Sequence, residues 1–220
     1  MNRAWMLALG VLVTIFASMT GLVLLPQTQL RGTAPVKDEE RDITLPAGYY
    51  GDIEEGRKVY MDLGCIYCHS QQVRPEGFGA DIERGWGARR SVARDYIHDE
   101  PPLMGTMRTG PDLMNIGARQ PSAQWHYLHL YQPRITSPGS IMPPHRFLFE
   151  LRHSAEGLPE DAVRLPDEFA PKKPAWIVPT DRARRLVAYL LSMDHNYEVP
   201  EARRPPCRKT RIRSAAASTA

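Results

Sequence analysis

The chain has 220 residues, of which 42% are hydrophobic and 24% are charged, as is ordinary for one folded domain with appendages. Its net charge is only +3 and it has no helix-turn-helix, basic-zipper or RNA-binding motif, which argues against nucleic acid as a partner. Three cysteines are too few for a disulfide framework, and twenty prolines predict long loops.

The first element along the chain is an apolar segment at residues 5–25 without a charged side chain. Twenty-one helical residues rising about 1.5 Å each cover about 31 Å, close to the hydrocarbon thickness of a bilayer. A cleaved signal peptide would have a shorter apolar region followed by a small-residue cleavage site. Residues 1–27 are therefore predicted to be an uncleaved transmembrane anchor. Arg3 before the segment and Arg31 with Lys37 after it leave its orientation open.

Residues 28–47 are polar and lack apolar periodicity, so they are predicted to be a linker. A first helix of the folded part is expected at residues 52–63, where acidic residues come early and Gly64 is a stop signal. A second helix fits residues 122–132 and is closed by a proline. The sequence shows no alternating strand pattern and no internal repeat.

The third helix is the clearest, and it begins at Thr180, whose hydroxyl is a typical N-cap. Its apolar residues fall on one face: Leu186, Val187, Leu190 and Leu191. A folded domain is therefore expected at residues 48–197. Residues 198–220 are basic, carry little apolar surface and are predicted to be disordered. The predicted fold class is mainly α, with one N-terminal transmembrane helix followed by a helical domain with long loops.

Cys65, Cys68 and His69 form a C-x-x-C-H motif directly after the first of these helices. A zinc site needs four tetrahedral ligands, and these residues supply at most three, with Cys68 and His69 awkwardly adjacent. A thioredoxin-like dithiol would follow a strand of a βαβ unit, which the sequence does not show. A covalent haem uses every element, with two thioethers and an axial imidazole. The motif predicts one haem c; a dithiol or a metal site is the alternative.

Such a haem needs a second axial ligand on the iron. Met142 lies in a loop whose two following prolines would hold a thioether rigidly, so it is the predicted ligand. The alternative is that Met142 fills the core, as methionines commonly do. The other candidates for the ligand are Met104, Met107, Met114 and His145.

Three more residues have a candidate role in binding a metal, one beside His69 and two in a separate site. The Pro111 carbonyl is expected to accept the ring N–H of His69 and so to fix its tautomer, although Gly110 and Pro111 also read simply as a turn. His126 and His129 share a helix face and could belong to a second metal site. A partly buried amphipathic helix is the favoured reading, because two histidines without a third ligand are common.

The long segment 70–107 contains arginines and aromatic residues and is predicted to be an interface. The alternatives are a solvated charge run and arginines that pair with haem propionates. The residues concerned are Arg84, Trp86, Arg89, Arg90, Arg94 and Tyr96. Residues 151–178 read as a surface excursion, and no role is assigned to it or to Cys207.

The order of the anchor, EGRKVYMDLGCIYCHSQQVRP, RTGPDL, GSIMPP and the helix after VPT resembles one family. It is the membrane-anchored mono-haem cytochrome c subunit of cbb3-type cytochrome c oxidases, called subunit II or the O subunit. The resemblance extends from the anchor to about His195. It implies a mainly helical cytochrome c fold, with Cys65 and Cys68 as haem attachment and His69 and Met142 as axial ligands.

The resemblance also implies a function in electron transfer. Electrons would pass through the haem to a haem-copper catalytic subunit, which reduces oxygen to water and pumps protons. This chain lacks a histidine cluster for copper, so it is expected to carry electrons without reducing oxygen itself. Ser91 is matched loosely to a family residue near a bound calcium.

The implied location is the bacterial inner membrane, with the cytochrome domain on the periplasmic side. The implied partners are the catalytic subunit and a further c-type cytochrome subunit. Two alternatives remain at this point. One is an anchored cytochrome c that serves another respiratory complex, such as a nitric oxide reductase, or acts as a shuttle. The other is an anchored thiol oxidoreductase or metal-binding protein without haem.

Overall fold

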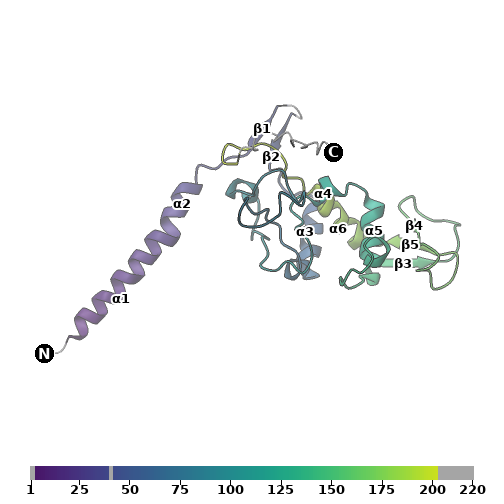
Figure 1. The fold of residues 1–220 in the computed structure, drawn as a ribbon, viewed down its shortest axis with the longest axis horizontal. Coiled ribbons are helices and arrows are strands. Elements are labelled where there is room, and N and C mark those ends of the chain that lie inside the picture. Colours follow the sequence, from purple (N-terminus) through teal and green to yellow (C-terminus); the bar gives the residue numbers. More distant parts are fainter. Residues whose placement is uncertain (1–2, 40–41, 203–220) are drawn as a thin grey trace, which may run out of the picture. The chain divides into compact units, whose positions relative to one another are not determined.

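The computed structural model describes residues 3–39 and 42–202. The chain divides into two compact units (Figure 1). The first takes the residues up to Ala47 together with Ala93–Glu100, and the second takes Gly48–Val92 and the residues from Pro101 onward. Cys207 and most of the predicted tail lie outside the described residues.

The first unit begins with a helix that is long and apolar enough to cross a membrane. It consists of α1 (Ala4–Met19), a π-helical turn (Thr20–Leu24) and α2 (Leu25–Leu30). Its side chains are almost all exposed, as a lipid-facing helix requires. The helix passes Pro26 and runs three residues beyond the predicted end of the anchor. Pro26 has no N–H to donate within the helix, and the π-helical turn, which is wider than an α-helical turn, ends two residues before it.

The predicted linker contains a small hairpin, which the sequence reading missed. Strands β1 (Val36–Asp38) and β2 (Ile43–Leu45) pair antiparallel, with Val36 opposite Leu45. Three residues are too few for an alternating pattern to stand out, and only Leu45 is buried. The 3₁₀ turn Ala93–Tyr96 belongs to the same unit, where Arg94 donates a hydrogen bond to the Ala34 carbonyl.

The second unit contains the three predicted helices, and their positions are confirmed. They are α3 (Asp52–Asp62), α5 (Ala123–Tyr131) and α6 (Asp181–Ser192), with the short α4 (Ile116–Arg119) in addition. Helices α3 and α6 lie side by side (Figure 1). A Cβ atom at Gly56 would collide with the Arg185 carbonyl, so the two backbones approach more closely than any larger residue allows.

Two of these helices begin at a residue whose side chain caps the first turn, and the sequence predicted the cap at Thr180. Ser122 Oγ accepts the Trp125 N–H at 3.3 Å, and Thr180 Oγ1 accepts the Ala183 N–H at 3.3 Å. The core of the unit is built from the facing apolar sides of the helices. Its most deeply buried members include Tyr60, Leu186, Val187 and Tyr189. Three further 3₁₀ turns complete the helical part: Cys65–Tyr67, Pro133–Ile135 and Arg146–Leu148.

Part of the predicted surface excursion at residues 151–178 belongs to a three-stranded antiparallel sheet. Its strands β3 (Phe149–Arg152), β4 (Val163–Arg164) and β5 (Trp176–Pro179) lie in the order β3–β5–β4 (Figure 1). Ile177 on the central strand is fully buried, so this region contributes to the core. The fold is therefore an apolar helix plus a mixed, mostly helical domain, whose short strands show no alternating pattern in the sequence.

The folded part also extends beyond the predicted boundary at residue 197. Val199 is 2% exposed and Ala202 is 8% exposed, so the first residues of the predicted tail are packed against the domain. The expectation of disorder is wrong for these residues.

Candidate functional site

The two cysteines and His69 lie on a single turn that follows α3. Gly64 ends the helix with a φ of 69°, a left-handed conformation that suits glycine. The chain then folds back so that the His69 and Cys68 N–H groups both donate to the Cys65 carbonyl, at 2.9 and 3.1 Å. Cys65 is partly buried, Cys68 is exposed, and both are free thiols. Burial raises the pKa of the Cys65 thiol to about 11.

The ring of His69 is held by residues from RTGPDL. Its Nδ1 lies 2.8 Å from the Pro111 carbonyl oxygen, so Nδ1 carries the proton and Nε2 is left as the metal-binding atom. A Cβ atom at Gly110 would lie 2.7 Å from Nδ1 and 2.8 Å from Nε2, so only glycine leaves room for the ring. Burial lowers the pKa of His69, and the Pro111 hydrogen bond opposes this shift. The ring is thereby kept neutral, as a metal ligand must be.

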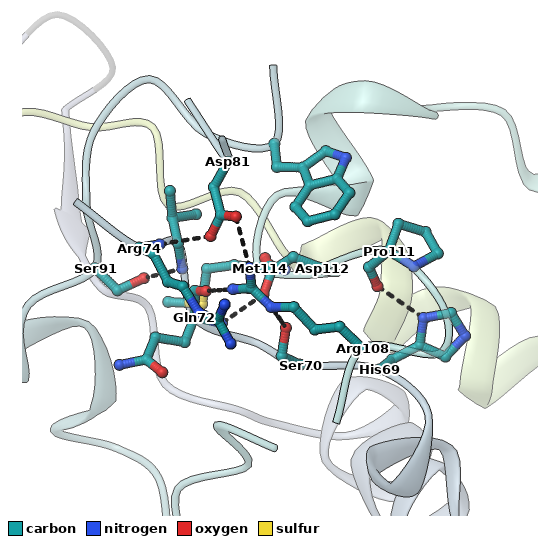
Figure 2. A network of polar contacts seen from close by, with 12 residues as sticks. His69, Ser70, Gln72, Arg74, Asp81, Ser91, Arg108, Pro111, Asp112 and Met114 are labelled. Carbon is teal, nitrogen blue, oxygen red and sulfur yellow. Dashed lines mark hydrogen bonds and ion pairs between the residues drawn. The ribbon is translucent and has the colours of Figure 1, made fainter. Parts of the chain in front are cut away.

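Two chain segments meet at this ring. The Gly110 N–H donates to the Cys68 carbonyl and the Leu113 N–H donates to the Ser70 carbonyl, both at 2.8 Å. The buried carboxylate of Asp112 also connects these two segments by hydrogen bonds (Figure 2). It is 0% exposed and accepts hydrogen bonds from Ser70 Oγ and the Gln72 N–H, both at 2.7 Å, and from the N–H two residues later at 2.9 Å.

Arg108 closes a buried polar network around this carboxylate (Figure 2). Its Nε donates to Ser70 Oγ at 2.8 Å, and its Nη1 lies 2.6 Å from Asp81 Oδ1. Its Nη2 donates to the Gln72 carbonyl and lies 3.6 Å from Asp112 Oδ2. Burial opposes the ionisation of Asp81, but the hydrogen bonds from Arg108 and from a backbone N–H outweigh it and hold the pKa of this carboxyl below its usual range. The sequence reading missed this network.

The loop of Met142 is fixed to α5. Met142 is partly buried against the core, and the His145 N–H donates to the Leu130 carbonyl of α5 at 2.8 Å. Burial, together with the neighbouring charges of His126, His69 and His145, lowers the pKa of His129 on the same helix to about 4. Helix α5 is therefore the element to which the loop that carries Met142 is attached.

Residues 2–166 match the family described as "Cytochrome C oxidase, mono-heme subunit/FixO". The chain belongs to the FixO family. It is a mono-haem subunit of a cbb3-type cytochrome c oxidase, acts in electron transfer and carries one covalent haem c, as predicted. The catalytic subunit of the oxidase is its partner. The long N-terminal helix is consistent with the membrane anchor of FixO. A comparison with curated proteins gave no match.

The local structure fits the haem that the FixO family carries. Two free thiols lie on one turn, one of them exposed, next to a neutral imidazole whose Nδ1 is already occupied. These are the groups that thioether formation and axial ligation require. The other methionines differ in their surroundings: Met114 is 2% exposed in the core, whereas Met104 and Met107 are exposed.

The two histidines of α5 make contacts typical of a packed helix in this FixO chain. His126 Nε2 lies 2.9 Å from the Gln120 carbonyl, and His129 Nδ1 lies 2.6 Å from Thr136 Oγ1. The His129 ring also stacks on Trp125. Within residues 3–39 and 42–202, no group of three or more His, Cys, Asp or Glu residues could hold a metal ion. These contacts favour the reading of a partly buried helix.

Two arginines of the long segment 70–107 donate hydrogen bonds to backbone carbonyls of the same chain. Arg89 is buried, donates from Nε to the Tyr197 carbonyl at 2.8 Å, and lies over the Tyr197 ring. Arg90 donates to the Glu201 carbonyl at 2.8 Å. The prediction that Arg89 belongs to an interface with another subunit is therefore wrong, because the side chain is enclosed by the C-terminal segment. Ser91 Oγ accepts the Val73 N–H at 2.9 Å.

Proposed function

We propose that Cys65 and Cys68 attach the haem of this FixO subunit and that His69 Nε2 and the sulfur of Met142 are its axial ligands. The observation that carries the proposal is the turn itself. Both thiols and the imidazole lie on it, and the Nδ1–H of His69 donates to the Pro111 carbonyl at 2.8 Å. We assign to Pro111 the role of fixing the tautomer of the axial histidine.

The ligand set explains why this subunit transfers electrons and does not reduce oxygen. The bound haem supplies one-electron chemistry between ferrous and ferric iron. His69 Nε2 and the neutral, soft sulfur of Met142 would hold the iron. With both of these donors on the iron, the chain would leave no position for oxygen. The residues of this chain hold the ligands still, which keeps the structural change on electron transfer small.

We also propose an arrangement in the membrane. The helix Ala4–Leu30 anchors the subunit in the bacterial inner membrane, and the second unit lies on the periplasmic side. A further c-type cytochrome subunit of the oxidase is a second partner, and it delivers or relays electrons. The support for these points is the family to which the chain belongs, since the charges that flank the helix do not decide the orientation.

The test is oxygen uptake by membranes that carry the complete oxidase. His69→Ala is expected to abolish uptake driven by an electron donor, while the complex is still present on a native gel. His153→Ala is the matched control, since it changes an exposed histidine directly after strand β3. Normal uptake by an assembled His69→Ala oxidase would contradict the proposal, and the chain would then be an anchoring subunit only.

A further inference from the structure

Asp112 directly follows the residue whose carbonyl accepts the His69 ring proton. Its carboxylate is fully enclosed and accepts three hydrogen bonds, two of them from Ser70 and Gln72 in the segment after His69 (Figure 2). One side chain therefore connects the segment that bears the imidazole to the segment that bears its acceptor. A peptide unit is rigid, so fixing Asp112 also fixes the direction of the Pro111 carbonyl.

A buried carboxylate of this kind is costly unless a cation balances it. Arg108 is that cation, and it is divided between two acidic residues. It lies 2.6 Å from Asp81 and 3.6 Å from Asp112, and its Nε also donates to Ser70 Oγ. Its guanidinium is enclosed on one face by Trp86 at 5.5 Å. The network therefore consists of one cation and two carboxylates, which several hydrogen bonds hold in one arrangement.

The position of the Pro111 carbonyl matters to the iron because of what the hydrogen bond does to the imidazole. An N–H that donates strongly to a carbonyl makes the ring a more basic ligand. A more basic ligand stabilises ferric iron more than ferrous iron, so it lowers the reduction potential. A carbonyl displaced from the ring would have the opposite effect.

We propose that Asp112, held in place by Arg108 and Ser70, is a positioning residue for His69 that lowers the reduction potential of the haem. The proposal rests on the proposed role of His69 as axial ligand. Asp112 does not touch the iron; it acts through the Pro111 carbonyl and through the segment that begins at Ser70.

Three variants of the full chain separate this role from a mere change of charge. Asp112→Asn removes an acceptor and the negative charge. Ser70→Ala removes one hydroxyl of the same network and no charge. Asp81→Asn is the control for charge, because it removes a buried carboxylate from the same guanidinium, and this carboxylate accepts no hydrogen bond from Ser70 or Gln72. The readouts are the reduction potential from an optical redox titration and the exchange rate of the His69 ring N–H in the ferrous protein.

Asp112→Asn is expected to raise the potential and to speed exchange of the ring proton, and Ser70→Ala to do both to a smaller extent. Asp81→Asn is expected to change both less than Asp112→Asn does, because Arg108 keeps its hydrogen bonds to Ser70 and Gln72. An unchanged potential and exchange rate in Ser70→Ala and in a folded Asp112→Asn would overturn the proposal, and so would an equal shift in Asp81→Asn. If Asp112→Asn does not incorporate haem, Ser70→Ala decides the question.

If the assignment of His69 as axial ligand were wrong, these measurements would give a different result. If His69 were not the axial ligand, His69→Ala would keep the six-coordinate spectrum of the parent protein. A protein that loses this spectrum in His69→Ala but shows no shift in Ser70→Ala and Asp112→Asn would retain the proposed function and lose only the positioning role.

Discussion

The Nδ1 atom of His69 lies 2.8 Å from the carbonyl oxygen of Pro111. The residue before Pro111, Gly110, lies against the same ring. Gly110→Ala is therefore expected to displace the imidazole, because a Cβ atom would lie 2.7 Å from Nδ1. The six-coordinate visible spectrum should be lost or the haem content reduced. Gly32→Ala is the control, since nothing lies within 4 Å of a Cβ atom there. A normal spectrum in Gly110→Ala would show that the ring can move without consequence.

Covalent attachment can be tested by acid–acetone extraction of the denatured protein. The pigment should remain on the polypeptide, because thioether bonds survive conditions that release a ligated haem. Cys65→Ala and Cys68→Ala should each lose one thioether, with comparable damage to haem retention. Cys207→Ser, which changes the third cysteine of the chain, should leave the spectrum unchanged. Haem recovered entirely in the extract of the parent protein would refute the attachment.

Met142 is tested by the access of foreign ligands to the iron. Met142→Ala should open one axial position, so that carbon monoxide or imidazole binds. Met142→His should keep six ligands and lower the reduction potential, because an imidazole favours ferric iron more than a thioether does. Met19→Ala, at an exposed methionine of the N-terminal helix that is not a candidate ligand, is the control. A Met142→Ala protein that stays low-spin and refuses these ligands would identify another axial residue, and His145 or Met107 would be examined next.

Arg89 is expected to matter for stability. Arg89→Ala removes a buried hydrogen bond from a charged group to the Tyr197 carbonyl and a cation–π contact, so the free energy of unfolding should fall by about 2 kcal/mol. Denaturant titration of the haem protein measures this change. Arg152→Ala should cost less than about 1 kcal/mol, because its ion pair with Glu150 is exposed. Equal effects of the two changes would mean that the C-terminal segment is not held by Arg89.

The buried imidazole of His129 makes stability depend on pH. Burial lowers its pKa to about 4 in the folded chain, against an ordinary value near 6.5 in the unfolded chain. Between these values the unfolded chain binds the additional proton, so the free energy of unfolding should fall as the pH drops from about 6.5 to about 4, by at most about 3 kcal/mol. His129→Gln should flatten this slope, whereas His153→Gln, at an exposed histidine, should not. An unchanged slope in His129→Gln would assign the effect to other groups.

The parts of the site that the sequence predicted are those encoded locally. Cys65, Cys68 and His69 are recognisable because one turn needs that spacing, and Thr180 because a hydroxyl before an apolar face is a typical cap. The Arg108 network was missed because its partners lie far away in the sequence and meet only when two segments pair. Arg89 was misread for a related reason, since its partner is a backbone carbonyl, which no side-chain pattern reveals.

The strands were missed for a different reason. Alternation needs several residues to be visible, and β4 contains two. The buried Ile177 belongs to a strand that becomes recognisable only beside its neighbours in the order β3–β5–β4. The helices were easier to predict because each extends over nine to twelve residues, which leaves room for start and stop signals at its ends.

The packing of α3 against α6 sets an order of events in biosynthesis. The turn with Cys65 and Cys68 leaves the ribosome early, whereas the helix Asp181–Ser192 that covers α3 is made near the end of the chain. Until then α3 lacks the partner against which Gly56 is fitted, so the turn is still open. Once folded, Cys65 is partly enclosed and its thiol is hard to ionise. The interval before α6 arrives is thus the period in which the Cys65 sulfur is most accessible, so we expect the haem to be attached to an incompletely folded chain.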